Sequence, residues 1–284
     1  MTRTIPSDIA ADFTAGASTL SRCVRLDLRD GTSVGITDHD ADLDVDLGDG
    51  SITYVAGTGA IPSAIKLSVG LDADNLEVRG PLTALITRAA VLGGRYDRAE
   101  VRVFDADWNS PTSYLRLLKG NVSQSRVEGG EFVFEIRSKA DFFNQSIGRV
   151  LSPYCTHDFG LGQCQATPET FTATVSAVTS DLEFTVSPDS PAPTADDIRG
   201  GLCTFLTGDL AGTLPVEIFE YAAGVVTLYA PLAELPTIGD TLRLTEGCEK
   251  TRTACKLKGQ ILNFGGFPDL SGTDDYLKYP VPGT

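Results

Sequence analysis

Four cysteines in the second half of the chain have the type and spacing that could bind a metal. They form two pairs, Cys155 with Cys164 in CTHDFGLGQC and Cys248 with Cys255 in CEKTRTAC. If the second segment is helical, its two thiols lie roughly 10 Å apart along the axis. A disulfide requires Cα atoms within about 7 Å. A helix would therefore disfavour a local disulfide there, whereas a loop would still allow one.

The gaps within the pairs bear on which metal they would bind. Structural zinc sites usually have about two to four residues between paired cysteines, and here the gaps hold eight and six. An iron–sulfur cluster is larger than one ion and accepts ligands from wider loops. The second pair also lies in a basic segment that contains Lys250, Arg252, Lys256 and Lys258. Such charge would lower the pKa of the thiols and offset the charge of a cluster, and Thr251 and Thr253 could donate hydrogen bonds to its sulfurs. The residues alone leave a cluster, zinc and free buried cysteines open.

The remaining chemical side chains suggest structure rather than catalysis. Cys23 and Cys203 each lie in an apolar strand-like segment, where a thiol packs as a small hydrophobe. The chain has two histidines, His39 and His157. Cys155 and His157 are only two residues apart in a loop, a spacing that rarely forms a nucleophile–base pair. We therefore expect no enzyme activity, with His157 beside the metal ligands or at the surface.

The overall composition excludes two classes of partner. The 284 residues carry a formal net charge of −15, so a phosphate backbone would be repelled. No apolar run reaches the roughly 18 residues that span a bilayer. Asp8 and Asp12 interrupt the N-terminal segment where an export signal would be apolar, and a short helix starting near Ser7 or Asp8 is predicted instead. Without export the chain would fold in a reducing compartment, where structural disulfides are rare.

The first 150 residues have the pattern of an antiparallel sheet. Alternating polar and apolar residues predict strands at 22–29, 32–37, 42–47, 99–108, 115–122 and 131–137. A short helix is predicted within 80–94, ending at Gly93-Gly94, and a second over 138–151. A sheet-rich unit of this size would be barrel-like, and we assign residues 1–150 to one domain.

An Asp-rich segment at 38–49 allows two interpretations. Asp42, Asp44 and Asp46 alternate with apolar residues, as on the exposed face of a strand. A calcium loop is the alternative, but the Gly and Glu positions of an EF-hand are not met. Instead of binding calcium, His39 would form buried hydrogen bonds within a turn. We predict a strand.

Residues 165–247 have the composition of a separate small all-β module. Short strands rich in Thr and Val alternate with turn residues. We place this module as an insertion between two parts of a cysteine-rich C-terminal region, 151–164 and 248–284. The predicted fold is therefore mainly β (α+β): a barrel-like antiparallel hub domain with short helices, the inserted module, and an irregular cysteine-rich region.

Several short motifs are spread over most of the chain, from about residue 5 to 280. They are GITDHD at 35–40, GRYD at 94–97, AEV at 99–101, Trp108, the Cys248–Cys255 spacing and NFGGFP at 263–268. On these motifs the chain resembles a tail hub protein family of phages and alphaproteobacterial gene transfer agents, and more distantly the tail tip protein of lambda-type phages. The paired cysteines and NFGGFP are the most specific part of this resemblance.

The resemblance implies a metal group and its ligands. Four cysteines of that family bind a [4Fe–4S] cluster. The matching positions in this sequence are Cys155, Cys164, Cys248 and Cys255. Cys23 and Cys203 match no family ligand. A zinc-stabilised adaptor and an iron–sulfur electron-transfer protein are the alternatives. Because the sequence offers no second cofactor site, a structural cluster that ties two distant segments together is favoured.

The resemblance also implies a structural role, assembled partners and a location. The protein would form a homotrimeric ring in the tail tip or baseplate and join the tail tube to the tip. Its neighbours would be the distal tail protein, a large tip or fibre-bearing protein, and a cell-wall peptidase of the tail. DNA would pass through the channel without specific binding, which suits an acidic chain. Assembly would take place in the bacterial cytoplasm, and the mature protein would be part of the virion.

Overall fold

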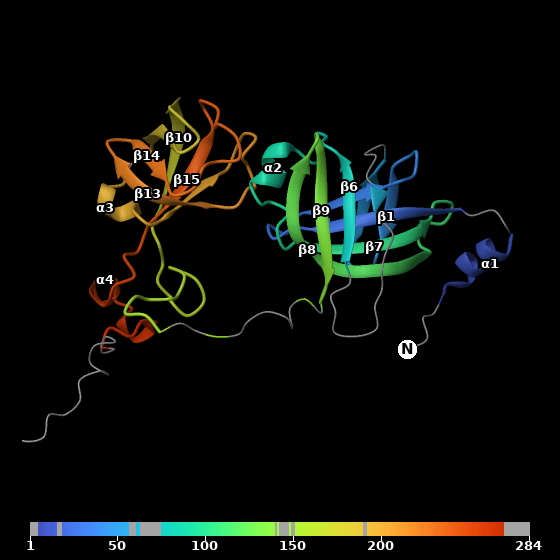
Figure 1. The fold of residues 1–284 in the computed structure, drawn as a ribbon, viewed down its shortest axis with the longest axis horizontal. Helices are drawn as coiled ribbons and strands as arrows, with labels where there is room; N and C mark the ends of the chain where they lie inside the picture. The colour runs from blue at the N-terminus through green and yellow to red at the C-terminus, as the bar shows by residue number, and fades with distance from the viewer. Residues whose placement is uncertain are drawn as a thin grey trace, which may run out of the picture. The chain divides into compact units, whose positions relative to one another are not determined.

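The computed structural model describes residues 5–15, 19–56, 61–62, 75–139, 141, 148, 151–189 and 192–269. The chain divides into two compact units. Unit 1 contains Met1–Ser146 and Asp209–Leu214, and unit 2 contains Ile147–Gly208 and Pro215–Thr284. Strands predominate in both units (Figure 1), so the predicted mainly β fold is confirmed. Among the described helices, none has the length and apolar character needed to cross a bilayer.

Within the described residues, unit 1 forms a nine-stranded sheet in the order β3-β4-β2-β1-β7-β8-β9-β6-β5. Neighbouring strands are antiparallel except β2 and β4, which are parallel. The strands are β1 Leu20–Asp27, β2 Ser33–Thr37, β3 Leu43–Asp46, β4 Ser51–Val55, β5 Ile61–Pro62, β6 Asn75–Pro81, β7 Glu100–Asp107, β8 Tyr114–Glu128 and β9 Glu131–Ser138. A helix, α1 (Ser7–Ala15), precedes the sheet and begins where the sequence predicted.

The long strand β8 turns the corner of this sheet. Its first half pairs with β7, and its second half, from Gly120 onward, pairs with β9. A Cβ atom on Gly120 would lie 2.4 Å from the carbonyl oxygen of Arg137, so only glycine allows the two strands to approach there. As a result β6 and β9 run across the direction of β1 and β7 (Figure 1), and the sheet folds over its own apolar face.

The main core of unit 1 lies between these crossing parts of the sheet. Alternation along β1 turns Val24 and Leu26 toward it, and β9 contributes the fully buried Phe132 and Phe134. Tyr96 packs against Phe134 with the ring centroids 5.0 Å apart. Burial of such side chains is the main favourable free energy of the fold.

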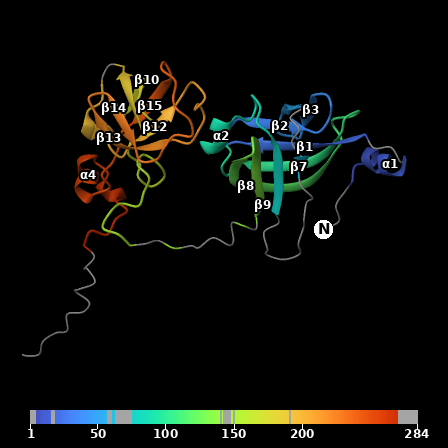
Figure 2. The ribbon, with the colours of Figure 1, turned by 45° about the horizontal axis from the view of Figure 1, so that its top comes forward.

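A smaller cluster occupies the other face of β1 and β7. The β3–β4 hairpin covers it with Leu43, Val45 and Tyr54, and Figure 2 shows β3 and β2 over this part of the sheet. The strand predicted in the Asp-rich segment is confirmed, because β3 alternates buried apolar with exposed Asp residues. Asp46 also accepts hydrogen bonds from the backbone of Gly48 and Gly50 in the turn that follows.

Of the two helices predicted at 80–94 and 138–151, the first is shorter than predicted and the second is not tested. The helix predicted within 80–94 is limited to α2 (Arg88–Leu92), which Thr87 caps by accepting a hydrogen bond from Ala90 N. Gly80 and Pro81 instead end β6, because they pair with β9. The helix predicted over 138–151 lies mostly outside the described residues.

Unit 2 is built around a closed six-stranded barrel, in the order β10-β11-β14-β13-β12-β15. The strands are β10 Thr170–Val178, β11 Glu183–Pro188, β12 Leu202–Phe205, β13 Val216–Ala222, β14 Val225–Leu228 and β15 Thr241–Thr245. A short helix, α3 (Ala195–Ile198), precedes β12. The predicted all-β module is thus a closed barrel, which leaves no unpaired edge.

The two cysteines expected to pack in strands do so. Cys23 of β1 and Cys203 of β12 are buried. Burial raises the pKa of the Cys23 thiol to about 11 and that of Cys203 to about 12. Such thiols stay protonated and behave as small apolar groups.

Candidate metal centre

Closure of the barrel brings the two cysteine segments together. Thr170, the first residue of β10, pairs with Thr245, the last residue of β15. The pairing continues one step further, where Glu246 N donates to Glu169 O at 2.8 Å. Because these strands are antiparallel neighbours, the segment before β10 and the segment after β15 leave the barrel side by side. The two cysteine pairs therefore meet at one end of unit 2.

All four cysteines line one small cavity in this region. The cavity is also lined by His157, Phe159, Ala166, Lys250, Thr251, Lys258, Gln260 and Asn263. Cys155 N donates to Lys250 O at 2.7 Å, which joins the two segments through their backbones. Among the described residues, no three His, Cys, Asp or Glu side chains are grouped closely enough to hold one metal ion. The four thiols thus share one cavity.

Backbone N–H groups point at two of the sulfurs. Gly265 N donates to Cys155 Sγ at 3.3 Å, and Lys250 N donates to Cys248 Sγ at 3.5 Å. Lys250 reaches this geometry with a φ of +60° and Gln165, directly after Cys164, has a φ of +54°. Non-glycine residues adopt such values only when their surroundings hold them there, which is common at functional sites. Donors of this kind stabilise thiolate ligands.

A short helix positions Cys255. Helix α4 (Arg252–Leu257) begins after Thr251, whose side chain accepts a hydrogen bond from Ala254 N at 3.2 Å. Cys255 lies inside this helix, and its thiol donates to Gln260 O at 3.1 Å. Cys248 precedes the helix, so Cys248 and Cys255 are not on one continuous helix. The hydroxyl of Thr251 serves as the helix cap, whereas Thr253 is exposed and does not line the cavity.

The NFGGFP motif closes one side of the cavity. Asn263 donates its side-chain N–H to Cys164 O at 3.4 Å, and His157 Nδ1 lies 3.0 Å from Asn263 O. A Cβ atom on Gly265 would lie 2.7 Å from the His157 ring, so the ring packs where only glycine fits. Residue-by-residue reasoning on the sequence missed Gly265 and the Lys250 N–H as sulfur donors. The NFGGFP motif, which contains Gly265, was the feature of the sequence that pointed to this segment.

The charges around the cavity differ from the prediction. Burial raises the pKa of the Cys255 thiol, and the nearby Cys155, Cys164 and Cys248 thiols raise it further. The predicted lowering by basic residues is therefore wrong for Cys255. Two of the basic groups have carboxylate partners: Lys258 pairs with Glu246, and Arg252 lies 3.2 Å from Asp269.

Comparison with known proteins identifies the family. The family described as "Baseplate hub protein, N-terminal attachment domain" matches residues 6–167. The chain belongs to this baseplate hub protein family. A second family, "Phage conserved hypothetical protein BR0599", matches residues 198–274 of the hub protein. The first cysteine pair lies in the first match and the second pair in the second, so the cavity combines both regions.

A solved structure resembles the hub protein over nearly its whole length. It comes from a "Virion of native gene transfer agent (GTA) particle", with 29% sequence identity, a TM-score of 0.80, and coverage of 98% of this chain and 97% of that one. A search of curated protein sequences found no match. The predicted family and the predicted place in a virion are confirmed, and the protein is a structural component of a phage-like tail.

Proposed function

We propose that this hub protein is a non-enzymatic ring component of the tail tip, stabilised by a structural [4Fe–4S] cluster. The ligands would be Cys155, Cys164, Cys248 and Cys255. One observation carries the cluster: four thiols from two distant segments line one cavity. The gaps of eight and six residues within the two cysteine pairs suit a cluster, whose ligands come from wider loops, better than a zinc ion.

The donor set fits such a group. Four thiolates are the usual ligands of a [4Fe–4S] cluster. The N–H groups of Gly265 and Lys250 already point at two of the sulfurs. When bound, the cluster would supply four metal–sulfur bonds that tie residues 155–164 to residues 248–255. These segments contain little buried apolar surface of their own: Ala254 is their one buried hydrophobic residue among those described.

Metal analysis tests the cluster directly. Anaerobically purified hub protein should absorb broadly near 400 nm and contain about four iron atoms per chain. Stoichiometric zinc without iron would refute the cluster and leave the zinc-stabilised adaptor. Protein with neither metal would refute both groups.

The ring is supported by the family and by the gene transfer agent virion neighbour. Three copies would join the tail tube to the tip. They would contact the distal tail protein, the large tip or fibre-bearing protein, and a cell-wall peptidase. DNA would pass through the ring without binding, because a chain of net charge −15 repels a polyanion. Mass measurement of the isolated tip should show three copies per particle, and a single copy would end the ring proposal.

A further inference from the structure

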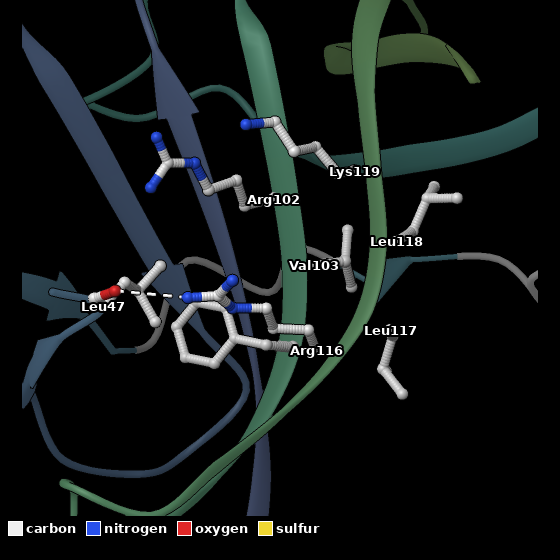
Figure 3. A pocket seen from close by; sticks show the side chains of 8 residues that line it. Leu47, Arg102, Val103, Arg116, Leu117, Leu118 and Lys119 are labelled. Atoms are coloured by element: carbon white, nitrogen blue, oxygen red, sulfur yellow. Dashed lines mark hydrogen bonds between the residues drawn. The ribbon is translucent and has the colours of Figure 1, made fainter. Parts of the chain in front are cut away.

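A pocket of about 240 Å³ lies in unit 1 between residues of β7 and β8 and Leu47, which follows β3. It is lined by Leu47, Arg102, Val103, Phe104, Arg116, Leu117, Leu118 and Lys119. Figure 3 shows the charged side chains of Arg102 and Arg116 extending to the left and that of Lys119 reaching from β8 toward β7, with Leu117 and Leu118 on the right. The proposed role of the hub protein uses none of these residues.

A β-bulge creates the pocket. Val103 pairs with Leu118, but the next residue, Phe104, pairs with Arg116, so Leu117 has no partner on β7. A bulge bends the strand and redirects side chains, and bulges occur often beside functional sites. Arg102 and Lys119 are direct cross-strand partners, and the bulge places Arg116 near them on the same side of the sheet (Figure 3).

The pocket carries an excess of positive charge. Arg25, Arg102, Lys119 and Lys139 share three carboxylates, those of Asp27, Asp49 and Glu100. Arg116 adds a fifth positive charge. Within the described part of the chain it has no carboxylate partner, and it donates to Leu47 O at 3.3 Å and to the Tyr114 hydroxyl at 3.1 Å. A local excess of two positive charges is unusual on a chain of net charge −15.

Size and lining restrict the ligand. Pockets for small organic ligands hold about 300–1,000 Å³, so this one suits one or two side chains rather than a cofactor. Phe104 and Leu47, which are themselves buried, form the apolar base of the pocket beside the cationic groups. A ligand with a carboxylate next to an apolar side chain would contact both the cationic and the apolar lining of the pocket. The planar guanidinium group of Arg116 matches the geometry of a carboxylate. A nucleic acid would gain from the cations but would be repelled by the rest of the molecule.

We propose that this pocket binds an acidic peptide segment of a neighbouring tail protein. The carboxylate of an Asp or Glu would pair with Arg116, and an adjacent aromatic or aliphatic side chain would lie against Phe104 and Leu47. Lys119 and Arg102 would add long-range attraction. This inference does not depend on the cluster, because all of these residues belong to unit 1.

Peptide titration of the intact hub protein tests the proposal. The probes are the tetrapeptide acetyl-Gly-Asp-Phe-Gly-amide and two matched peptides, with Asn for Asp or Ala for Phe, followed by NMR of labelled Leu and Val methyl groups. The Asp-Phe peptide should shift the methyl signals of Leu47 and Val103. Both matched peptides should bind about tenfold more weakly. Arg116→Gln should weaken binding of the Asp-Phe peptide by a similar factor and leave the affinity for the Asn peptide unchanged.

Lys139→Gln is the matched control, since it removes a cation from the same charge network without lining the pocket. It should leave the affinity for the Asp-Phe peptide within twofold. Equal binding of the Asp and Asn peptides, or no methyl shifts at all, would overturn the proposal. It would also be overturned if inorganic phosphate or a ten-nucleotide oligothymidine displaced the peptide at equal concentration, because the site would then be a general anion site.

Discussion

Replacing Gly265 by alanine perturbs the closure of the cysteine cavity without removing a ligand. The added Cβ atom would lie 2.7 Å from the His157 ring, well inside the van der Waals contact distance. Gly265 is buried and its N–H donates to Cys155 Sγ, so the backbone cannot move away without losing that hydrogen bond. Overpacking of this kind costs about 1–3 kcal/mol.

The expected result follows from that cost. Local opening should become about 5- to 150-fold more frequent, since about 1.4 kcal/mol corresponds to a factor of ten. Hydrogen exchange followed by mass spectrometry should show faster exchange in peptides covering 153–165 and 250–267. Exchange in the barrel strands should change little. Gly148→Ala is the matched control, because a Cβ atom there meets no atom of the described residues within 4 Å.

A double variant makes the prediction sharper. His157→Ala removes the ring that the new methyl group would strike. If the clash is the cause, the combined variant should be less destabilised than the sum of the two single changes. Additive effects, or unchanged exchange in Gly265→Ala alone, would refute the assignment of His157 and Gly265 as a packed pair.

Three further outcomes are expected. Cys255→Ser should lose iron and become sensitive to protease in the cysteine-rich region, and normal iron content would argue against its role as a ligand. Gly120→Ala should destabilise unit 1 by about 2 kcal/mol or more, because its Cβ atom would strike a β9 carbonyl oxygen, and urea unfolding monitored by Trp108 fluorescence measures this. The hydrogen bond from Arg102 holds the pKa of Asp49 below its ordinary value, so the associated stability is present above about pH 4 and is lost as the pH falls through the lowered pKa. Arg102→Gln should flatten this acid dependence of the urea midpoint, and an unchanged pH profile would contradict it.

Local patterns in the sequence were enough for much of the fold. Alternation of apolar and polar residues along 22–29 and 42–47 predicted β1 and β3, since side chains of a strand point to opposite faces in turn. The turn-rich composition of 165–247 predicted a small all-β module. The predicted helix within 80–94 was too long, because pairing of Gly80 and Pro81 with β9 outweighed the local helical pattern.

For the candidate metal site, too, the sequence predicted some features and could not predict others. Residue type and spacing singled out the four cysteines and the neighbouring basic segment, and the family motifs pointed to the NFGGFP segment. Which backbone groups would face the sulfurs could not be predicted, because the N–H groups of Gly265 and Lys250 depend on loop conformations rather than on residue type. The contribution of Lys258 was also misjudged, since its ammonium group pairs with the carboxylate of Glu246.

The sequence by itself determined several strands, among them β1 and β3, and the two thiols that are buried as apolar groups, Cys23 and Cys203, since these follow from local pattern and chemistry. Only the tertiary structure decided what those residues meet. The pairing of Thr170 with Thr245 joins two cysteine segments far apart in the chain, and the unpaired Leu117 opens the cationic pocket. Both depend on strand register, which is set by the packing of the whole sheet or barrel and not by any short segment.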